Sequence, residues 1–249
     1  MENQIEKNID YVVEWLREQV KSSKTQGLVV GISGGIDSAV VAYLAQRAFP
    51  HNSIGVILPI KSSVSDIEDG LLVAKECNIT SLTVDLVREH EGIIEKVTNE
   101  LKNINKFHEN NIRTMDANLR ARLRMSTLYS IANNLNYLVV GTDNAAEIYT
   151  GYFTKYGDGA VDLLPIGSLK KYEVYEWAKV LGVSQRILDK APSAGLWEGQ
   201  TDELEMGVSY GSIDDYLDNK TVDEKDKQVI NKLHLATQHK RQRPLIPKI

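Results

Sequence analysis

The sequence predicts an α/β protein with a doubly wound, mostly parallel sheet and helices on both faces. Short apolar runs rich in β-branched residues alternate along the chain with stretches of helical periodicity. The first of these runs leads directly into a glycine pair and then into a helix. Parallel strands need helical crossovers, and these crossovers cover the faces of the sheet. Ligands of such sheets bind beyond the carboxyl ends of the strands, so we expect the chemistry there.

The alternation runs from the N-terminus to about residue 142. One face of a first helix is predicted from apolar residues that recur at spacings of three or four, namely Ile5, Ile9, Val12, Leu16 and Val20. The further elements expected, in chain order, are a strand over 28–33, a helix over 37–48, a strand over 53–60, a helix over 66–77, a strand over 81–86, a helix over 89–101, an exposed loop over 103–113, a helix over 117–133 and a strand over 137–142.

The pattern changes after residue 142, where glycines punctuate a polar stretch. A helix is predicted over 171–181. The segment 191–203 contains Pro192, Gly195 and Gly199 with little periodicity, which predicts a mobile loop. Two more helical stretches follow, the longer over about 222–237.

Length and composition limit the class of protein. A chain of 249 residues accommodates one large α/β domain and is short for two, so we expect a single domain over 1–249. The formal net charge of -5 disfavours a dedicated nucleic-acid binder. No apolar run approaches the ~18 residues needed to span a bilayer, and the polar N-terminus lacks a secretory core. We therefore expect a cytoplasmic protein with neither nucleic acid nor membrane as partner.

The single cysteine, Cys77, excludes an internal disulfide and a four-cysteine metal site. A reducing compartment agrees with this usage. We expect Cys77 to pack rather than act as a nucleophile. The tryptophans Trp15, Trp177 and Trp197 are likewise expected to pack rather than stack on bases.

The segment Ser33-Gly34-Gly35-Ile36-Asp37-Ser38 lies where the first strand meets a helix. The glycines permit positive φ and close approach of a phosphate to the backbone. Free N–H groups and the helix dipole favour an anion at this point. An acid, Asp37, makes sense beside phosphates if it holds a divalent cation. The alternative is a plain tight turn in which Asp37 caps the helix.

This six-residue string resembles the Ser-Gly-Gly-x-Asp-Ser signature of the ATP-pyrophosphatase superfamily. The resemblance implies an adenine-nucleotide α-hydrolase-like fold. It also implies cleavage of ATP between the α- and β-phosphates, with transient adenylylation of a substrate oxygen. The signature does not choose the substrate.

Sequence blocks at 141–147, 151–159 and 162–165 resemble the NAD synthetase family, and those at 121–125 and 239–242 agree. The resemblance spans about residues 31–242. It implies an ammonia-dependent ligase of NAD biosynthesis that converts ATP, deamido-NAD and ammonia to AMP, pyrophosphate and NAD, with Mg²⁺. It further implies a homodimer whose deamido-NAD sites lie at the interface.

The resemblance also implies roles for individual residues. Asp37 and Glu147 would bind Mg²⁺, and Asp158 and Lys171 would serve catalysis, Asp158 by deprotonating ammonium. The family usually has threonine at the position of Ser193, which puts the ordering of that loop in doubt. The implied ATP contacts are Gly31, Ile32, Ser33, Gly34, Gly35, Ile36, Asp37, Ser38, Thr142, Lys171 and Ser193. The implied deamido-NAD contacts are Arg122, Lys155, Asp162, His239 and Lys240.

The chemistry agrees with these roles. A carboxylate resists attack by ammonia because it is anionic and would have to expel oxide, and adenylylation replaces that leaving group with AMP. Charge developing at the α-phosphorus needs neutralisation, which a metal and Lys171 can supply. Ammonia is mostly protonated at neutral pH, so a carboxylate such as Asp158 can accept a proton from it.

Alternative readings stay open at this stage. Taken singly, Glu147, Lys155 and Lys171 are ordinary surface charges, and His239 with its basic neighbours is a solvated tail or a weak nucleic-acid patch. One rival function is an RNA-modifying ATP-pyrophosphatase, which an acidic chain with one cysteine fits poorly. Another is a nucleotide-binding module without catalysis. Since no amidase domain fits before Gly31 or after residue 242, we expect free ammonia as the nitrogen donor.

Overall fold

The computed structural model describes residues 2–193 and 201–247 of the protein. A four-stranded sheet in the order β3-β2-β1-β4 lies at its centre, and every pair of neighbouring strands is parallel. The strands are β1 (Gly27–Gly31), β2 (Ser53–Ile57), β3 (Thr80–Thr83) and β4 (Tyr137–Val140). The helices are α1 (Glu2–Ser23), α2 (Ile36–Ala48), α3 (Val64–Glu76), α4 (Val87–Asn103), α5 (Ile112–Leu135), α6 (Ala145–Thr150), α7 (Lys171–Leu181), α8 (Gln185–Leu188), α9 (Asp202–Met206), α10 (Tyr210–Leu217) and α11 (Glu224–Ala236), with 3-10 turns η1 (Glu109–Asn111) and η2 (Gln238–Lys240).

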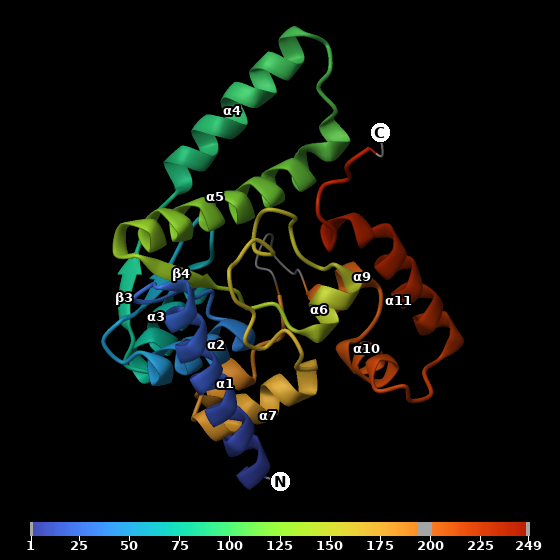
Figure 1. Cartoon of the computed structure of the whole chain (residues 1–249). Coiled ribbons are helices and arrows are strands. Elements are labelled where there is room, and N and C mark those ends of the chain that lie inside the picture. The colour runs from blue at the N-terminus through green and yellow to red at the C-terminus, as the bar shows by residue number, and fades with distance from the viewer. Residues whose placement is uncertain (1, 194–200, 248–249) are drawn as a thin grey trace.

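Helices cover both faces of this sheet, as the sequence predicts (Figure 1). Successive residues of β1 point to opposite faces. Leu28 and Val30 therefore join the core beneath α1, α2 and α7, whereas Val29 joins the core beneath α5. Burial on both faces explains why the central strand reads as a continuous apolar run.

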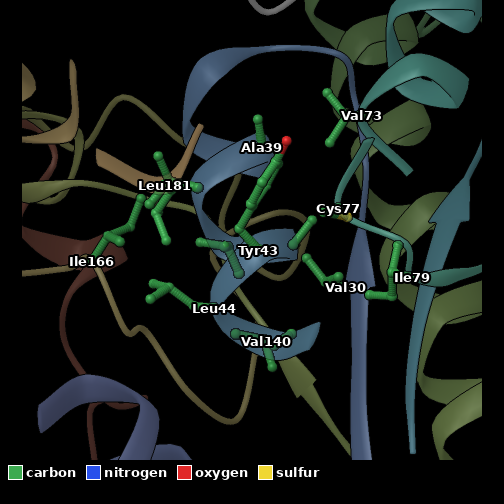
Figure 2. Close-up of a cluster of buried hydrophobic side chains, with 14 of the residues drawn as sticks. Val30, Ala39, Tyr43, Leu44, Val73, Cys77, Ile79, Val140, Ile166 and Leu181 are labelled. Atoms are coloured by element: carbon green, nitrogen blue, oxygen red, sulfur yellow. The ribbon is translucent and has the colours of Figure 1, made fainter. Parts of the chain in front are cut away.

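The larger core surrounds α2, which is buried on nearly all sides. Figure 2 shows Tyr43 and Leu44 of this helix between Val30 on one side and Leu181 of α7 on the other. Cys77 lies in the same cluster, and burial raises the pKa of its thiol to about 11. The prediction that Cys77 packs is therefore confirmed.

The tryptophans of the described segments also pack, since Trp177 is buried in this core and Trp15 lies against it. Trp197 and the central part of the predicted mobile loop lie outside the described residues. No helix in the described part of the chain is long and apolar enough to cross a membrane.

The element boundaries differ from the predicted ones where side-chain caps or tertiary packing decide. The loop predicted over 103–113 is shorter, because η1 leads directly into α5 at Ile112. The strand predicted over 53–60 ends at Ile57. The loop predicted over 191–203 gives way to α9 at Asp202, because Thr201 caps that helix by accepting a hydrogen bond from the backbone N–H of Leu204. The short helices α6 and α8 escaped prediction because each has too few residues to show a period.

Helices α10 and α11 form a separate apolar cluster with α6 beside the sheet. Ala146 of α6 packs with Tyr210 and Ile213 of α10 and Ile230 of α11. Figure 1 shows these helices next to the loops that follow β4. The cluster thus holds α6, which follows β4, at the carboxyl edge of the sheet.

Replacing Leu44 with alanine tests the central packing. Leu44 is fully buried, so Leu44→Ala should lower the free energy of unfolding by about 2 to 5 kcal/mol through lost burial and a cavity. Urea unfolding followed by circular dichroism measures this. Leu235→Ala is the matched control, because Leu235 is 68% exposed, and it should change stability by less than about 0.5 kcal/mol. Equal effects of the two substitutions would contradict the assignment of the core.

Candidate active site

A cavity of about 1050 Å³ opens at the carboxyl ends of β1, β2 and β4. Its lining includes the glycine loop after β1, the residues that follow β2, one face of α5 and the segment that follows β4. Thr142 and Ser193, both expected to touch ATP, line it as well. The parallel sheet therefore collects segments from across the whole chain at one edge, as expected for this architecture.

The glycine loop is shaped by its own backbone and by α3. Gly34 has a φ of +80°, and a Cβ at this position would lie 2.7 Å from the Cβ of Asp69. Only glycine fits such a conformation and such a close approach. The Ser33 and Ser38 hydroxyl oxygens lie 3.0 Å apart, and Ser38 donates to the Gly35 carbonyl. The loop thus presents hydroxyls and the N-terminus of α2 to the cavity, which suits a phosphate.

Asp37 does not cap α2, so the alternative reading of the loop as a plain capped turn is wrong. The N-cap residue is Gly35, and no side chain caps the helix. Instead, the Asp37 carboxylate accepts a hydrogen bond from Lys171 Nζ at 2.5 Å and another from Asn144 Nδ2 at 2.9 Å. Lys171 Nζ also lies 3.6 Å from the Glu147 carboxylate. Two carboxylates predicted for one site, Asp37 of α2 and Glu147 of α6, therefore meet at the ammonium group of Lys171, which begins α7.

Asn144 fixes both carboxylates, and the sequence analysis assigned it no role. Its side chain accepts a hydrogen bond from the Glu147 N–H while the Glu147 carboxylate accepts one from the Asn144 N–H, which is a capping box at the start of α6. The same side chain donates to Asp37. The spacing Asn-x-x-Glu was the available signal, because it is typical of a helix start.

Tyr210 and Asp202 extend the cluster and were also missed. The Tyr210 hydroxyl lies 3.0 Å from a Glu147 carboxylate oxygen and 3.0 Å from an Asp202 oxygen. The Tyr152 hydroxyl contacts Asp202 from the other side, at 3.2 Å. These residues come from α9, α10 and the loop after α6, and no local pattern links such distant positions.

The charge of Lys171 is stabilised by its partners. Its side chain is buried, and burial alone would lower its pKa, but the Asp37 and Glu147 carboxylates outweigh burial and raise the pKa. Burial, together with Asp37, raises the pKa of Glu147 to about 7, against the opposing effect of Lys171. The cluster therefore holds more carboxylates than one lysine compensates.

Asp143 and Asp158 add to this excess of acid. Burial raises the pKa of Asp143 well above its usual range, and the neighbouring carboxylates Asp158, Glu147 and Asp37 raise it further. Asp158 lines the cavity, and burial of its carboxyl there raises its pKa. The backbone N–H of Thr154 holds the Asp158 carboxylate at 2.9 Å. Perturbed carboxyls grouped in a cavity are typical of a catalytic site.

The residues expected to contact deamido-NAD lie in two places. Lys240 lines the cavity, where its Nζ donates to the carbonyls of Gly151 and Phe153. The other four, Arg122, Lys155, Asp162 and His239, are not among the lining residues.

Three of these four residues are linked by hydrogen bonds to backbone carbonyls. Arg122 donates to the Lys155 carbonyl, and Lys155 Nζ donates to the His239 carbonyl at 2.6 Å. Asp162 instead anchors β4, since its carboxylate accepts hydrogen bonds from the Val139 N–H and the Tyr129 hydroxyl. The structure therefore gives Asp162 a structural contact in addition to its expected role.

Comparisons with known proteins show the family of the chain. The family model described as NAD synthase matches residues 8–244. The chain belongs to the NAD synthase family. The chain is 66% identical, over 100% of both chains, to a protein of Alkaliphilus oremlandii named NH(3)-dependent NAD(+) synthetase.

Two solved structures cover nearly the whole chain. An NMN synthetase from Francisella tularensis is 42% identical with a TM-score of 0.90, over 98% of this chain and 99% of that one. An NH3-dependent NAD synthetase from Campylobacter jejuni is 30% identical with a TM-score of 0.79, over the same shares. The chain therefore does not belong to a family of RNA-modifying ATP-pyrophosphatases or of non-catalytic nucleotide-binding modules.

The donor set of Asp37 and Glu147 fits Mg²⁺ only together with a substrate. Among residues 2–193 and 201–247, no three His, Cys, Asp or Glu side chains are grouped to hold a metal by themselves. Mg²⁺ in nucleotide enzymes is often held by one or two carboxylates plus substrate phosphates and water. Two convergent carboxylates beside a phosphate loop match that pattern.

The acid excess predicts a pH-dependent stability of the ligand-free protein. The folded pKa of Glu147 lies above its unfolded value of 4.5, so this contribution to stability is complete below about pH 4.5 and lost as the pH rises through about 7. Glu147→Gln should therefore reduce the loss of stability between pH 5 and pH 8 by roughly 2 kcal/mol. Urea unfolding at both pH values measures this.

Glu18→Gln is the control, because Glu18 is exposed on α1. This variant should follow the unmodified protein at both pH values. If Glu147→Gln did the same, the carboxylate of Glu147 would not be a source of the acid excess.

Proposed function

We propose that this protein uses the cavity to make NAD from deamido-NAD, ATP and ammonia, releasing AMP and pyrophosphate. The observation that carries the proposal is the meeting of the glycine loop, Asp37, Glu147 and Lys171 at the carboxyl edge of the sheet. The relative that is 66% identical bears the name of this activity. ATP is the co-substrate of the family, and the glycine loop is the part of the cavity suited to its phosphates.

In the first step, an oxygen of the nicotinate carboxylate attacks the α-phosphorus of ATP, and the bond to the β-phosphate breaks, with pyrophosphate as leaving group. Lys171 is fixed by Asp37 and Glu147 and stays charged, so it offsets negative charge that develops on the phosphates. The N-terminus of α2 and the Ser33 and Ser38 hydroxyls orient the same phosphates. Mg²⁺, held by Asp37 and Glu147 with phosphate oxygens, would neutralise further charge there.

In the second step, ammonia attacks the carbonyl carbon of the adenylylated carboxyl, and AMP leaves. The nitrogen must lose a proton on the way to the amide. Asp158 is suited to accept it, because its raised pKa makes it a stronger base than an ordinary aspartate. Its place in the cavity wall, between Thr154 and Lys240, fixes the carboxylate while leaving it open to the cavity.

Free ammonia is the nitrogen donor in this proposal. The full-length relative carries NH(3)-dependent in its name and matches this chain from end to end. We propose that the chain acts as a single domain over 1–249, without an amidase, and in the cytoplasm. Purified glutamine in place of ammonium is then expected to give no NAD.

We further propose a homodimer in which each copy helps bind the other's deamido-NAD. Arg122, Lys155 and His239 lie outside the cavity lining, so a second surface is needed to bring them to the substrate. An exposed apolar stretch is available on α4 and the start of α5, which project from the body of the molecule (Figure 1). Its members are Ile93, Val97, Ile104 and Ile112, each 39% to 62% exposed.

A second candidate function is the same amidation of nicotinate mononucleotide, giving NMN. The observation that favours it is the TM-score of 0.90 with the Francisella tularensis NMN synthetase, against 0.79 with the Campylobacter jejuni NAD synthetase. The chemistry of both steps is identical, because the two acids share the nicotinate carboxylate. They differ in the adenylate half, which only the dinucleotide carries.

Assaying both acids decides between the candidates. With ATP, Mg²⁺ and ammonium, the protein should convert deamido-NAD to NAD with one AMP per turnover, at a kcat/KM above that for nicotinate mononucleotide. Asp37→Asn should lower kcat at least about 100-fold, because a charge next to Lys171 and the metal is lost, and chelation of Mg²⁺ should have a similar effect. Chromatography of NAD, NMN and AMP measures all products.

A higher kcat/KM for the mononucleotide would move the function to the second candidate. If neither acid were amidated by folded protein, both candidates would fail. Arg17→Gln, far from the cavity on α1, serves as a control for the Asp37 variant and should keep its rate.

Light scattering tests the dimer. The expected mass is twice the 27.9 kDa of the chain. Val97→Glu should shift the mass toward one chain, since a charge in an apolar interface is costly, and should raise the KM for deamido-NAD more than that for ATP. A single-chain mass for the unmodified protein at micromolar concentration, with full activity, would overturn the proposal.

A further inference from the structure

The block 121–125 places two arginines of α5 on different sides of the helix. Residues two apart on an α-helix point about 200° away from one another. Arg122 is exposed and contacts the Lys155 carbonyl, outside the cavity lining. Arg124 lines the cavity. The structure therefore separates the arginine expected to contact deamido-NAD from a second one that no role yet accounts for.

Arg124 is held by two neutral oxygens. Its Nε donates to the Leu58 carbonyl at 3.0 Å, and its Nη2 lies 3.4 Å from the Ser62 hydroxyl. Both partners lie just after β2. Among the described residues, no Asp or Glu side chain forms an ion pair with it. A guanidinium has five N–H donors, so part of its hydrogen-bonding capacity faces the cavity unused.

The charge of Arg124 is costly where it lies. Burial, together with the charge of Arg120, lowers its pKa to about 10, against the opposing effect of Asp158 and Asp66. At neutral pH the group is still a cation. A half-buried cation without an adjacent carboxylate is costly unless a ligand compensates its charge.

Other cations of the cavity wall already have partners. Lys190 Nζ lies 2.8 Å from Asp66 and 2.7 Å from Asp69. Lys240 donates to two backbone carbonyls. The cavity is also lined by four carboxylates, those of Asp37, Asp143, Glu147 and Asp158. An anionic substrate that enters such a wall needs a cation not committed to a carboxylate.

We propose that Arg124 is a substrate-binding residue that takes an anionic oxygen of the bound substrates. The planar guanidinium matches the paired oxygens of a phosphate or a carboxylate, which a lysine does not. Two sources supply this chemistry in the proposed reaction, a phosphate of ATP and the nicotinate carboxylate. For the nicotinate carboxylate, the inference rests on the proposed function. For a phosphate of ATP, it rests on the cavity alone.

The test uses Arg124→Gln and Arg124→Lys in the full-length protein. Loss of a charge-assisted hydrogen bond of about 1.5 to 3 kcal/mol corresponds to roughly 10- to 100-fold. Arg124→Gln should therefore raise one KM by at least 10-fold. Arg124→Lys should restore part of the lost affinity, because lysine keeps the positive charge but lacks the paired N–H donors of the guanidinium. The affinity for α,β-methylene-ATP, which the enzyme cannot split between these phosphates, is measured by calorimetry without the second substrate.

The two sources give different results. If the oxygen belongs to ATP, the affinity for α,β-methylene-ATP falls at least 10-fold and the KM for deamido-NAD changes little. If it belongs to the carboxylate, the analogue binds as before, the KM for deamido-NAD rises, and inhibition by NAD, which has a neutral amide instead, is unchanged. Values within twofold of the unmodified protein in all three measurements would overturn the proposal.

Two controls separate binding from folding. Arg17→Gln removes a guanidinium that likewise donates to backbone carbonyls, those of Ala48 and Arg47, but on α1. It should leave every affinity unchanged. A fall in affinity for Arg124→Gln that tracked a lower melting temperature, with Arg124→Lys no better, would assign Arg124 a purely structural role and overturn the proposal. If the unmodified protein amidates neither acid, the analogue titration alone decides, and equal affinities overturn it.

Discussion

The ion cluster of Lys171 with Asp37 and Glu147 is the constraint on which the site depends. Lys171 begins α7, and its partners follow β1 and β4, so the cluster connects segments up to 134 positions apart. Asn144 fixes both acids. Removing one partner of a buried pair leaves an uncompensated charge, so the cluster ties the position of α7 to the glycine loop.

The cavity is suited to a cation, such as a metal that enters with the substrate phosphates, because it holds more carboxylates than its own cations balance. Glu147, Asp143 and Asp158 all have raised pKa values, each first of all because of burial. The carboxylates of the cavity wall repel one another, and a bound metal or another positive group would relieve this repulsion. In the proposed reaction, the carboxylates beside Lys171 compensate cations, and Asp158 accepts the proton that leaves the attacking nitrogen.

The sequence predicted the fold and the carboxyl-edge site because both depend on local patterns. The junction between strand and helix at residues 31–38 requires a residue with positive φ, and Gly34 provides it. Tyr210 and Asp202 were beyond such reasoning, because they reach the site through packing of α9 and α10. The different placement of Arg122 and Arg124 was also hidden, since it needs the rotation of α5 against the sheet. Short helices such as α6 were missed because a capping box alone carries less signal than a full period.

The resemblance to a family assigned roles that geometry alone does not. The structure brings Asp37, Glu147, Thr142 and Asp158 to the lining of one cavity, where Lys171 donates a hydrogen bond to Asp37. It leaves Arg122, Lys155 and His239 outside that lining. The proposed homodimer would reconcile the two observations. In that proposal, one chain supplies the residues at the carboxyl edge of the sheet, and the interface supplies further contacts to the substrate.

The central claim is that this cavity adenylylates a carboxylate, and isotope transfer tests it most directly. Deamido-NAD labelled with ¹⁸O in its nicotinate carboxylate would be turned over with unlabelled ATP, and the AMP analysed by mass spectrometry. The account predicts one ¹⁸O atom in the phosphate of AMP, because the oxygen that attacks the α-phosphorus leaves with it. Unlabelled AMP formed together with NAD would contradict the account.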